Sequence, residues 1–152
     1  KIAVLGGPVT SYPSVMRREG AQQAMRDAGI LFSDKLYGLS NYDFESAYHA
    51  VNSLLARRAD FTALFAMSDV IALGAIRALV SAGLRVPEDV QVMGYDGLRA
   101  FGDQDYYCST IVQPVEAMAE TCVDLVLQDS HANTPSLLCL PVRYAYGGTT
   151  KA

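Results

Sequence analysis

Residues 61–97, FTALFAMSDVIALGAIRALVSAGLRVPEDVQVMGYDG, decide the fold because they read as a strand, a helix and a second strand. Phe61 to Met67 is an apolar run that is too short for a helix, which is typical of a strand covered on both faces. A second apolar run, Val90 to Tyr95, follows the turn VPED. Two buried strands joined by a helical crossover are expected to lie parallel, with a right-handed connection.

The helix between these two runs carries signals at both ends. Ser68 or Asp69 can accept hydrogen bonds from the first-turn amides, and Asp69 also complements the positive end of the helix dipole. Gly83 ends the helix, since glycine adopts a left-handed conformation without steric cost. Apolar residues lie nearly all round the helix, so we expect it to be covered on more than one side. The second cover is either a neighbouring helix of the same chain or a second copy of the chain.

The remaining elements follow from the same signals. Strands are expected at 1–6, 35–39, 108–113 and 137–146, and helices at 14–28, 44–58 and 115–128. The last of these helices is amphipathic, and an isolated helix of this length is only marginally stable in water. We therefore expect it to fold back onto the body or to swap onto a neighbouring chain.

The sequence resembles the effector-binding domain of the lactose-repressor family of bacterial transcription regulators, which shares its fold with periplasmic sugar-binding proteins. The resemblance rests on AMSDxxALGAxRAL followed by AGLRVPEDVxVMGYDG. The segments KIAVLGGP, RREGAQQAMRDAGI, STIVQP and LPVRYAYGGTT also occur in the family's order, so it covers nearly the whole chain. It implies a doubly wound α/β fold with a mostly parallel sheet flanked by helices.

The resemblance also implies a division of the chain between two lobes. Residues 1–108 and 137–152 form the carboxyl-terminal lobe, and residues 109–136 form a crossover strand and helix that belong to the other lobe. The abrupt start in a strand suggests a fragment, and in the family a DNA-reading helix-turn-helix and the first half of the effector domain come before this point. We therefore expect DNA contact only through a region absent from this chain, and a homodimer that presents two such regions.

The composition excludes several other classes. The net charge is -4 with scattered Lys and Arg, so the chain lacks the basic face that phosphate-backbone binding needs. No apolar run approaches the roughly 20 residues that span a bilayer. Cys108, Cys122 and Cys139 are odd in number and fit no zinc spacing, which indicates core residues in a reducing, cytoplasmic compartment. We expect no metal and no cofactor.

The first candidate ligand residue follows the first strand. Gly6-Gly7-Pro8 forms a turn without GxGxxG spacing, which favours a structural turn over a nucleotide-phosphate cradle. In the family, the arginine three residues before the helix glycine reaches into the ligand cleft, and Arg17 and Gly20 match that pattern. Arginine suits the task because its planar fork offers paired donors that stay charged.

Five further residues complete the predicted ligand set: Tyr42, Ser68, Asp69, Asp96 and Gln113. The family places an aromatic at Tyr42 against the ligand's apolar face, although loop tyrosines are more often packing residues. Ser68 stands where the family usually has Asn, so ligand identity does not carry over from a relative. Asp96 matches an acid that accepts hydroxyl hydrogens from a polyol, or else is a turn residue. Gln113, at the crossover, is a ligand contact or a hinge residue.

Enzymatic chemistry has little support in the sequence. His49 and His131 are far from any nucleophile motif, and there is no GxSxG elbow, HExxH or Walker loop. We therefore expect a non-enzymatic, ligand-sensing regulator that binds a small polar effector, and the resemblance implies a sugar. The alternatives are a secreted sugar-binding protein of a transport system, which would have an upstream signal peptide, and an α/β enzyme.

Overall fold

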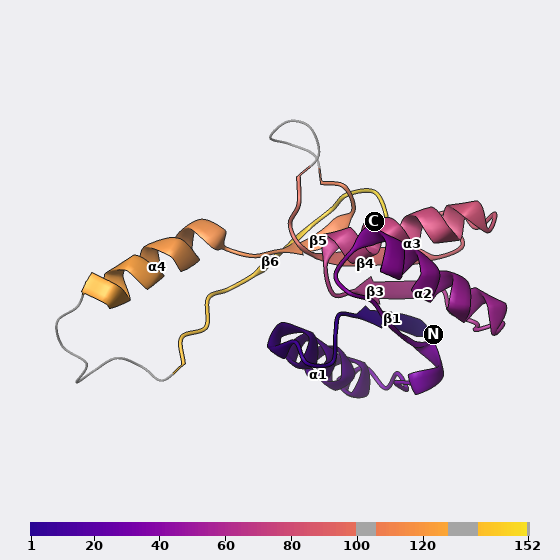
Figure 1. Ribbon diagram of the computed structural model, residues 1–152, viewed down its shortest axis with the longest axis horizontal. Helices are drawn as coiled ribbons and strands as arrows, with labels where there is room; N and C mark the ends of the chain where they lie inside the picture. The colour runs from indigo at the N-terminus through magenta and orange to yellow at the C-terminus, as the bar shows by residue number, and fades with distance from the viewer. Residues whose placement is uncertain (100–105, 128–136, 152) are drawn as a thin grey trace.

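The computed structural model describes residues 1–99, 106–127 and 137–151 (Figure 1). Within these residues the elements are β1 (Ile2–Gly6), α1 (Tyr12–Asp27), the short 3-10 helix η1 (Asp34–Leu36), β2 (Tyr37–Leu39), α2 (Phe44–Ala56), β3 (Ala63–Ala66), α3 (Asp69–Ser81), β4 (Gln91–Asp96), β5 (Ser109–Val112), α4 (Val115–Leu127) and β6 (Arg143–Ala145).

The strands form one sheet in the order β2-β1-β3-β4-β5-β6. The first five are parallel to their neighbours, and β6 runs antiparallel to β5. Strands β3 and β4 are adjacent and parallel, which confirms the arrangement expected of the central unit. The doubly wound, mostly parallel α/β fold is therefore confirmed.

The end signals predicted for α3 act as expected, and α2 has a cap of the same kind. The Ser68 side chain accepts a hydrogen bond from the Ile71 amide at 3.1 Å and caps α3. Asp43 does the same for α2, with a 2.7 Å bond from the Ser46 amide. Gly83 has a φ of +82° just beyond α3, where a residue with a side chain would be strained.

Helices α2 and α3 cover one face of the sheet and pack closely against each other. A side chain at Gly74 would collide with the Phe44 carbonyl and the Ala47 side chain, so glycine is needed for the two helices to approach. Leu54 and Leu79 are fully buried in the core that these helices form with the sheet. The second cover of α3 is thus a neighbouring helix of the same chain.

Among the residues that the structure describes, the opposite face of the sheet carries only helix α1, and its cover is incomplete. A groove of about 570 Å³ lies between α1 and the sheet, lined by Ile2, Val4, Met16, Arg17, Gly20, Ala21, Ala24, Met25, Phe65, Met93, Tyr95 and Ile111. In β3 the burial alternates, with Leu64 fully covered and Phe65 only half-buried. The expectation that β3 is fully covered on both faces was therefore wrong for this side.

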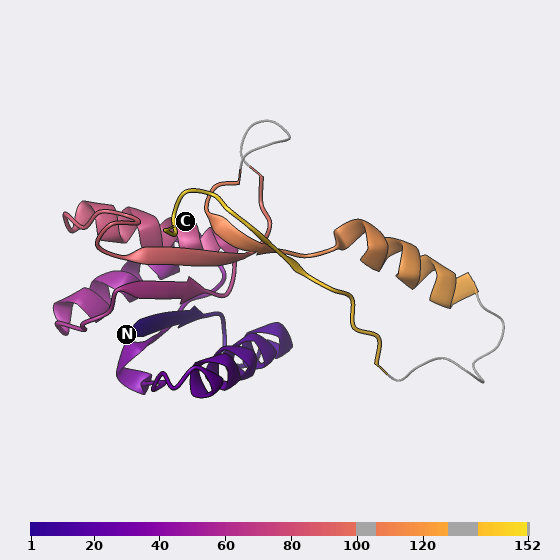
Figure 2. The ribbon, with the colours of Figure 1, turned by 180° about the vertical axis from the view of Figure 1, so that it is seen from behind.

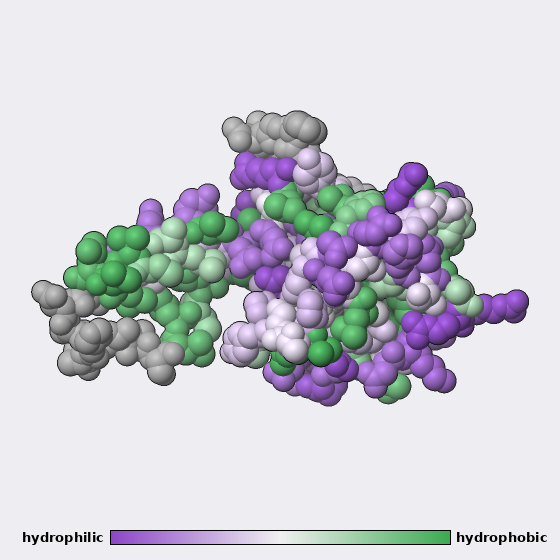
Figure 3. Space-filling model, in the orientation of Figure 1, coloured by the Kyte–Doolittle hydropathy of each residue, from purple (hydrophilic) through white to green (hydrophobic). Residues whose placement is uncertain are grey.

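Helix α4 stands away from the body at the end of β5 and β6 (Figures 1 and 2). We call α4 with residues 137–142 the arm. None of the α4 residues is buried, and hydrophobic side chains cover much of the arm surface (Figure 3). Of the two expected arrangements, folding back onto the body is therefore wrong, and a swap onto a neighbouring chain stays a prediction.

Residues 147–151, here called the tail, return to the sheet and join β4 to β5. The Val92 amide donates to the Thr149 carbonyl at 2.8 Å, and the Thr149 hydroxyl donates to the Val92 carbonyl at 2.7 Å. The Ser109 amide in turn donates to the Thr149 hydroxyl at 2.9 Å. One threonine thus satisfies backbone groups of two neighbouring strands.

Several strands are shorter than predicted, β2 and β6 among them. Residues 34–36 form η1, so β2 begins only at Tyr37. Strand β6 is confined to 143–145, which are the residues paired with β5. No helix among the described residues is long and apolar enough to cross a membrane.

Candidate functional site

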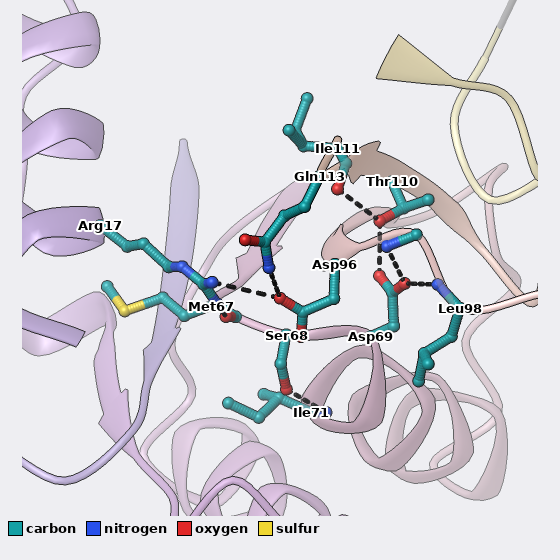
Figure 4. A network of polar contacts seen from close by, with 11 residues as sticks. Arg17, Met67, Ser68, Asp69, Ile71, Asp96, Leu98, Thr110, Ile111 and Gln113 are labelled. Carbon is teal, nitrogen blue, oxygen red and sulfur yellow. Dashed lines mark hydrogen bonds and ion pairs between the residues drawn. The ribbon is translucent and has the colours of Figure 1, made fainter. Parts of the chain in front are cut away.

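Arg17, Asp96 and Gln113 meet at the carboxyl edge of the sheet (Figure 4). The Arg17 Nη2 atom lies 3.1 Å from Asp96 Oδ1, and Gln113 Nε2 donates to the same oxygen at 2.7 Å. Arg17 Nη1 donates to the Met67 carbonyl at the end of β3. Two of the predicted ligand residues, Arg17 and Asp96, thus contact each other at the edge where open α/β sheets bind ligands.

The position of Arg17 follows from how α1 begins. The turn after β1 places the first turns of α1 beside the ends of β3 and β4, and the guanidinium carbon of Arg17 lies 3.9 Å from the centre of the Tyr95 ring. A cation over an aromatic face is stabilised by the ring quadrupole. The Tyr95 ring, the Met67 carbonyl and the Asp96 carboxylate together fix the Arg17 side chain. This side chain is 18% exposed.

Asp96 combines an unusual backbone with a half-buried carboxylate. Its φ is +124°, a region that residues with side chains rarely adopt. Burial raises the pKa of the Asp96 carboxyl, and the nearby Arg17 charge and the Gln113 hydrogen bond oppose that rise. The side chain is 32% exposed, so the carboxylate still reaches the surface.

Ser68 and Asp69 lie beneath this edge instead of at its surface. Ser68 is 4% exposed, and its hydroxyl caps α3. Asp69 is 0% exposed, and both carboxylate oxygens accept hydrogen bonds within the chain. Direct ligand contact by Asp69 is therefore excluded in this arrangement by its burial, and contact by Ser68 stays a prediction.

Tyr42 lies after β2, with its ring directly on Gly7. A Cβ atom added at Gly7 would overlap the Tyr42 ring, and one added at Gly6 would overlap the Tyr37 side chain. The two glycines are thus needed for aromatic rings to approach the backbone, which agrees with a structural turn. The Tyr42 hydroxyl is buried, with no hydrogen-bond partner among the described residues. A ligand contact by Tyr42 stays a prediction.

Other reactive groups do not extend the site. His49 is exposed and lies 3.3 Å from Glu45, whereas His131 lies outside the described residues. Burial, together with the charge of Asp69, raises the pKa of the Cys108 thiol to about 12, so it stays protonated. The described residues contain no group of three or more His, Cys, Asp or Glu that could hold a metal ion.

Sequence reasoning missed two parts of the site. The Met67 carbonyl is a backbone group that no residue pattern identifies. The Tyr95 ring was assigned to a strand, and its adjacency to Asp96 in GYDG was the only available signal.

A scan of protein families matches residues 1–150 to the periplasmic binding protein-like domain. The transcriptional regulator MalR of Clostridium butyricum is 41% identical over 113 residues, which are 72% of this chain and 33% of MalR. The regulator CelR of Thermobifida fusca is 33% identical over 127 residues, 84% of this chain and 37% of CelR. The chain thus spans about a third of the length of these curated relatives.

Solved structures agree with this result. The lac repressor dimer bound to operator and the anti-inducer ONPF superimposes with a TM-score of 0.85 at 29% identity, covering 100% of this chain and 53% of that one. The CelR–cellobiose complex gives a TM-score of 0.79 at 31% identity, covering 97% and 46%. The chain therefore belongs to the periplasmic binding protein-like family, as an effector-binding domain of the lactose-repressor type of transcriptional regulator.

Proposed function

We propose that this chain senses a small polar effector, a sugar, for a bacterial transcriptional regulator, and that the effector binds where Arg17, Asp96 and Gln113 meet. The observation that carries the proposal is this cluster itself. Arg17 and Gln113 supply donors and Asp96 an acceptor, which together complement the hydroxyl groups of a polyol. The opposite charges of Arg17 and Asp96 balance, which suits a neutral ligand better than an anion.

The relatives support a regulator over a transport protein. MalR and CelR are named as transcriptional regulators, and CelR has been solved with cellobiose. A structurally similar protein from Escherichia coli, with a TM-score of 0.83 at 28% identity and covering 97% of this chain and 54% of that one, is described as a sugar-binding regulator. A sugar effector and a cytoplasmic location follow by analogy with them.

The arm supports a two-lobed mechanism. An apolar helix with no buried residue needs cover, and a second lobe packed on α4 would supply it. Gln113 lies between β5 and α4 and also bonds Asp96, so it joins the lobes at the proposed site. An effector that bridges them would shift the population between two lobe arrangements, and so change operator binding by a region absent from this chain.

We also propose a homodimer. The outward side of α3 carries exposed Arg77 and Val80 beside partly buried Leu73 and Ile76. Ile76→Glu would place a charge in that surface and should shift the sedimentation of the full-length protein towards the monomer. If the variant forms a dimer as stable as that of the unmodified protein, α3 does not lie in the interface.

The effector proposal is tested by titrating full-length protein with cellobiose and a panel of other sugars in a calorimeter. Arg17→Ala and Asp96→Ala should each weaken binding by about tenfold or more, because each removes a charged hydrogen-bonding group. The matched control is Arg18→Ala, since Arg18 pairs with Asp34 at 3.1 Å, away from Asp96. Unchanged affinity in both site variants would refute the assignment.

A further inference from the structure

Asp69 is a buried carboxylate with an unusually complete set of donors. Its Oδ2 atom accepts from the Gly97 amide at 2.8 Å and the Leu98 amide at 2.6 Å (Figure 4). Its Oδ1 atom accepts from the Thr110 hydroxyl at 2.6 Å, and the Cys108 thiol lies 3.6 Å away. The first residue of a helix also lies in the favourable field of the helix dipole.

These bonds fall on the two residues that directly follow Asp96. Asp96 and Gly97 have φ values of +124° and +87°, so the chain makes two successive left-handed steps at the end of β4. Only glycine tolerates such a φ freely, so residue 96 persists in it only if its surroundings hold it. The bonds from Asp69 to Gly97 and Leu98 are in the right place to do so.

We propose that Asp69 is a positioning residue for the effector site: it fixes the turn after β4 and so directs the Asp96 carboxylate towards Arg17 and Gln113. The inference rests on the proposed function only in that Asp96 is the group positioned. Asp69 acts through Asp96, and a ligand never touches it. Asp69 thus holds the turn in place, and Asp96 contacts the effector.

Asn is the informative replacement because it keeps the shape of the side chain. A neutral amide oxygen accepts hydrogen bonds more weakly than a carboxylate oxygen does, and the NH2 group that replaces the other oxygen can only donate. Asp69→Asn should therefore weaken the hold on the Gly97 and Leu98 amides and let residue 96 relax towards negative φ.

The test measures unfolding of the full-length protein with Asp96→Ala or Asp96→Gly, each with and without Asp69→Asn. While Asp69 is present, the Asp96→Gly chain should have an unfolding constant about fivefold lower than the Asp96→Ala chain, because glycine relieves the strain. With Asp69→Asn the advantage of glycine should vanish or reverse, because the relaxed turn holds no strain. An equal advantage in both backgrounds would show that Asp69 only fills the core.

Amide hydrogen exchange and cellobiose binding test the proposal in two further ways. If Asp69→Asn does not fold, amide hydrogen exchange in the unmodified protein decides: Gly97 and Leu98 should be protected, and exchange at free-loop rates would overturn the proposal. Asp69→Asn should also weaken cellobiose binding, if Asp96→Ala does. Failure of all sugars to bind would count against the proposed function, whereas the unfolding comparison would still report on Asp69.

Discussion

Helices α3 and α4 have 13 residues each and carry apolar side chains on more than one side, yet their surroundings differ completely. Seven residues of α3 are buried, because it packs on the sheet and beside α2. In α4 none is buried, because it stands beyond the ends of β5 and β6. The apolar pattern shows that a helix needs cover, but the neighbouring elements decide whether the chain supplies it.

The largest difference between the two helices should appear on truncating an apolar side chain. Leu79→Ala in α3 should lower the free energy of unfolding by about 2–5 kcal/mol, because it leaves a cavity in a fully buried site. Leu127→Ala in α4 should change it by less than about 0.5 kcal/mol, since Leu127 is 75% exposed. Denaturant unfolding of this chain measures both, and equal losses would mean that α4 is covered.

A smaller effect is expected where α3 meets α2. Gly74→Ala should lower the free energy of unfolding by about 1–3 kcal/mol, because the new methyl group collides with the Phe44 carbonyl. The control is Gly20→Ala in α1, where no atom lies within 4 Å of the added carbon. That change should stabilise the chain by up to about 1 kcal/mol, because alanine favours the helix. Destabilisation of similar size at both positions would contradict this account of the crossing.

Proteolysis tests the comparison without a mutation. Chymotrypsin should cut this chain within residues 115–127 long before it cuts within residues 69–81, because local opening of an unpacked helix requires little free energy. Fragments identified by mass spectrometry would show the order. Protection of α4 equal to that of α3 would show that the arm docks in solution.

The smallest expected effect concerns the link between body and arm, the Gln113–Asp96 bond. Because burial raises the pKa of Asp96 above its usual 3.8, the folded chain holds this proton more tightly than the unfolded chain does. The resulting stabilisation is complete below the unfolded pKa and is lost as the pH rises through the folded one. The free energy of unfolding of the unmodified chain, minus that of Asp96→Asn, should therefore fall as the pH rises through this range. If the difference rises instead, folding lowers the pKa of Asp96.

Signals close in sequence predicted most of the fold. Ser68 and Gly83 set the bounds of α3 almost to the residue, and Asp43 set the start of α2. The burial of side chains was harder to predict. Whether Phe65 is buried, for example, depends on elements that are remote in the chain. In the same way, the expected 137–146 strand shrank to three residues because only those have a partner.

The same distinction between local signals and contacts remote in the chain applies to the candidate site. Arg17, Asp96 and Gln113 were identified by resemblance, and the structure brings them into contact, whereas their role in binding stays a prediction. Asp69 was predicted to contact the ligand, but a carboxylate at a helix start can face outward or inward. Hydrogen bonds from the turn after β4 and from Thr110 in β5 turn it inward, and no local pattern encodes them.

The tail has a consequence for how the chain matures during synthesis. Thr149 satisfies backbone groups of Val92 and Ser109, so the sheet's hydrogen bonding between β4 and β5 is complete only after residue 149 has left the ribosome. Helices α2 and α3 can pack on the first strands well before then, since domains tend to fold from the amino end as they emerge. The half-made chain therefore passes through a stage in which the edge of the sheet at β4 is unfinished and open to pairing with other chains.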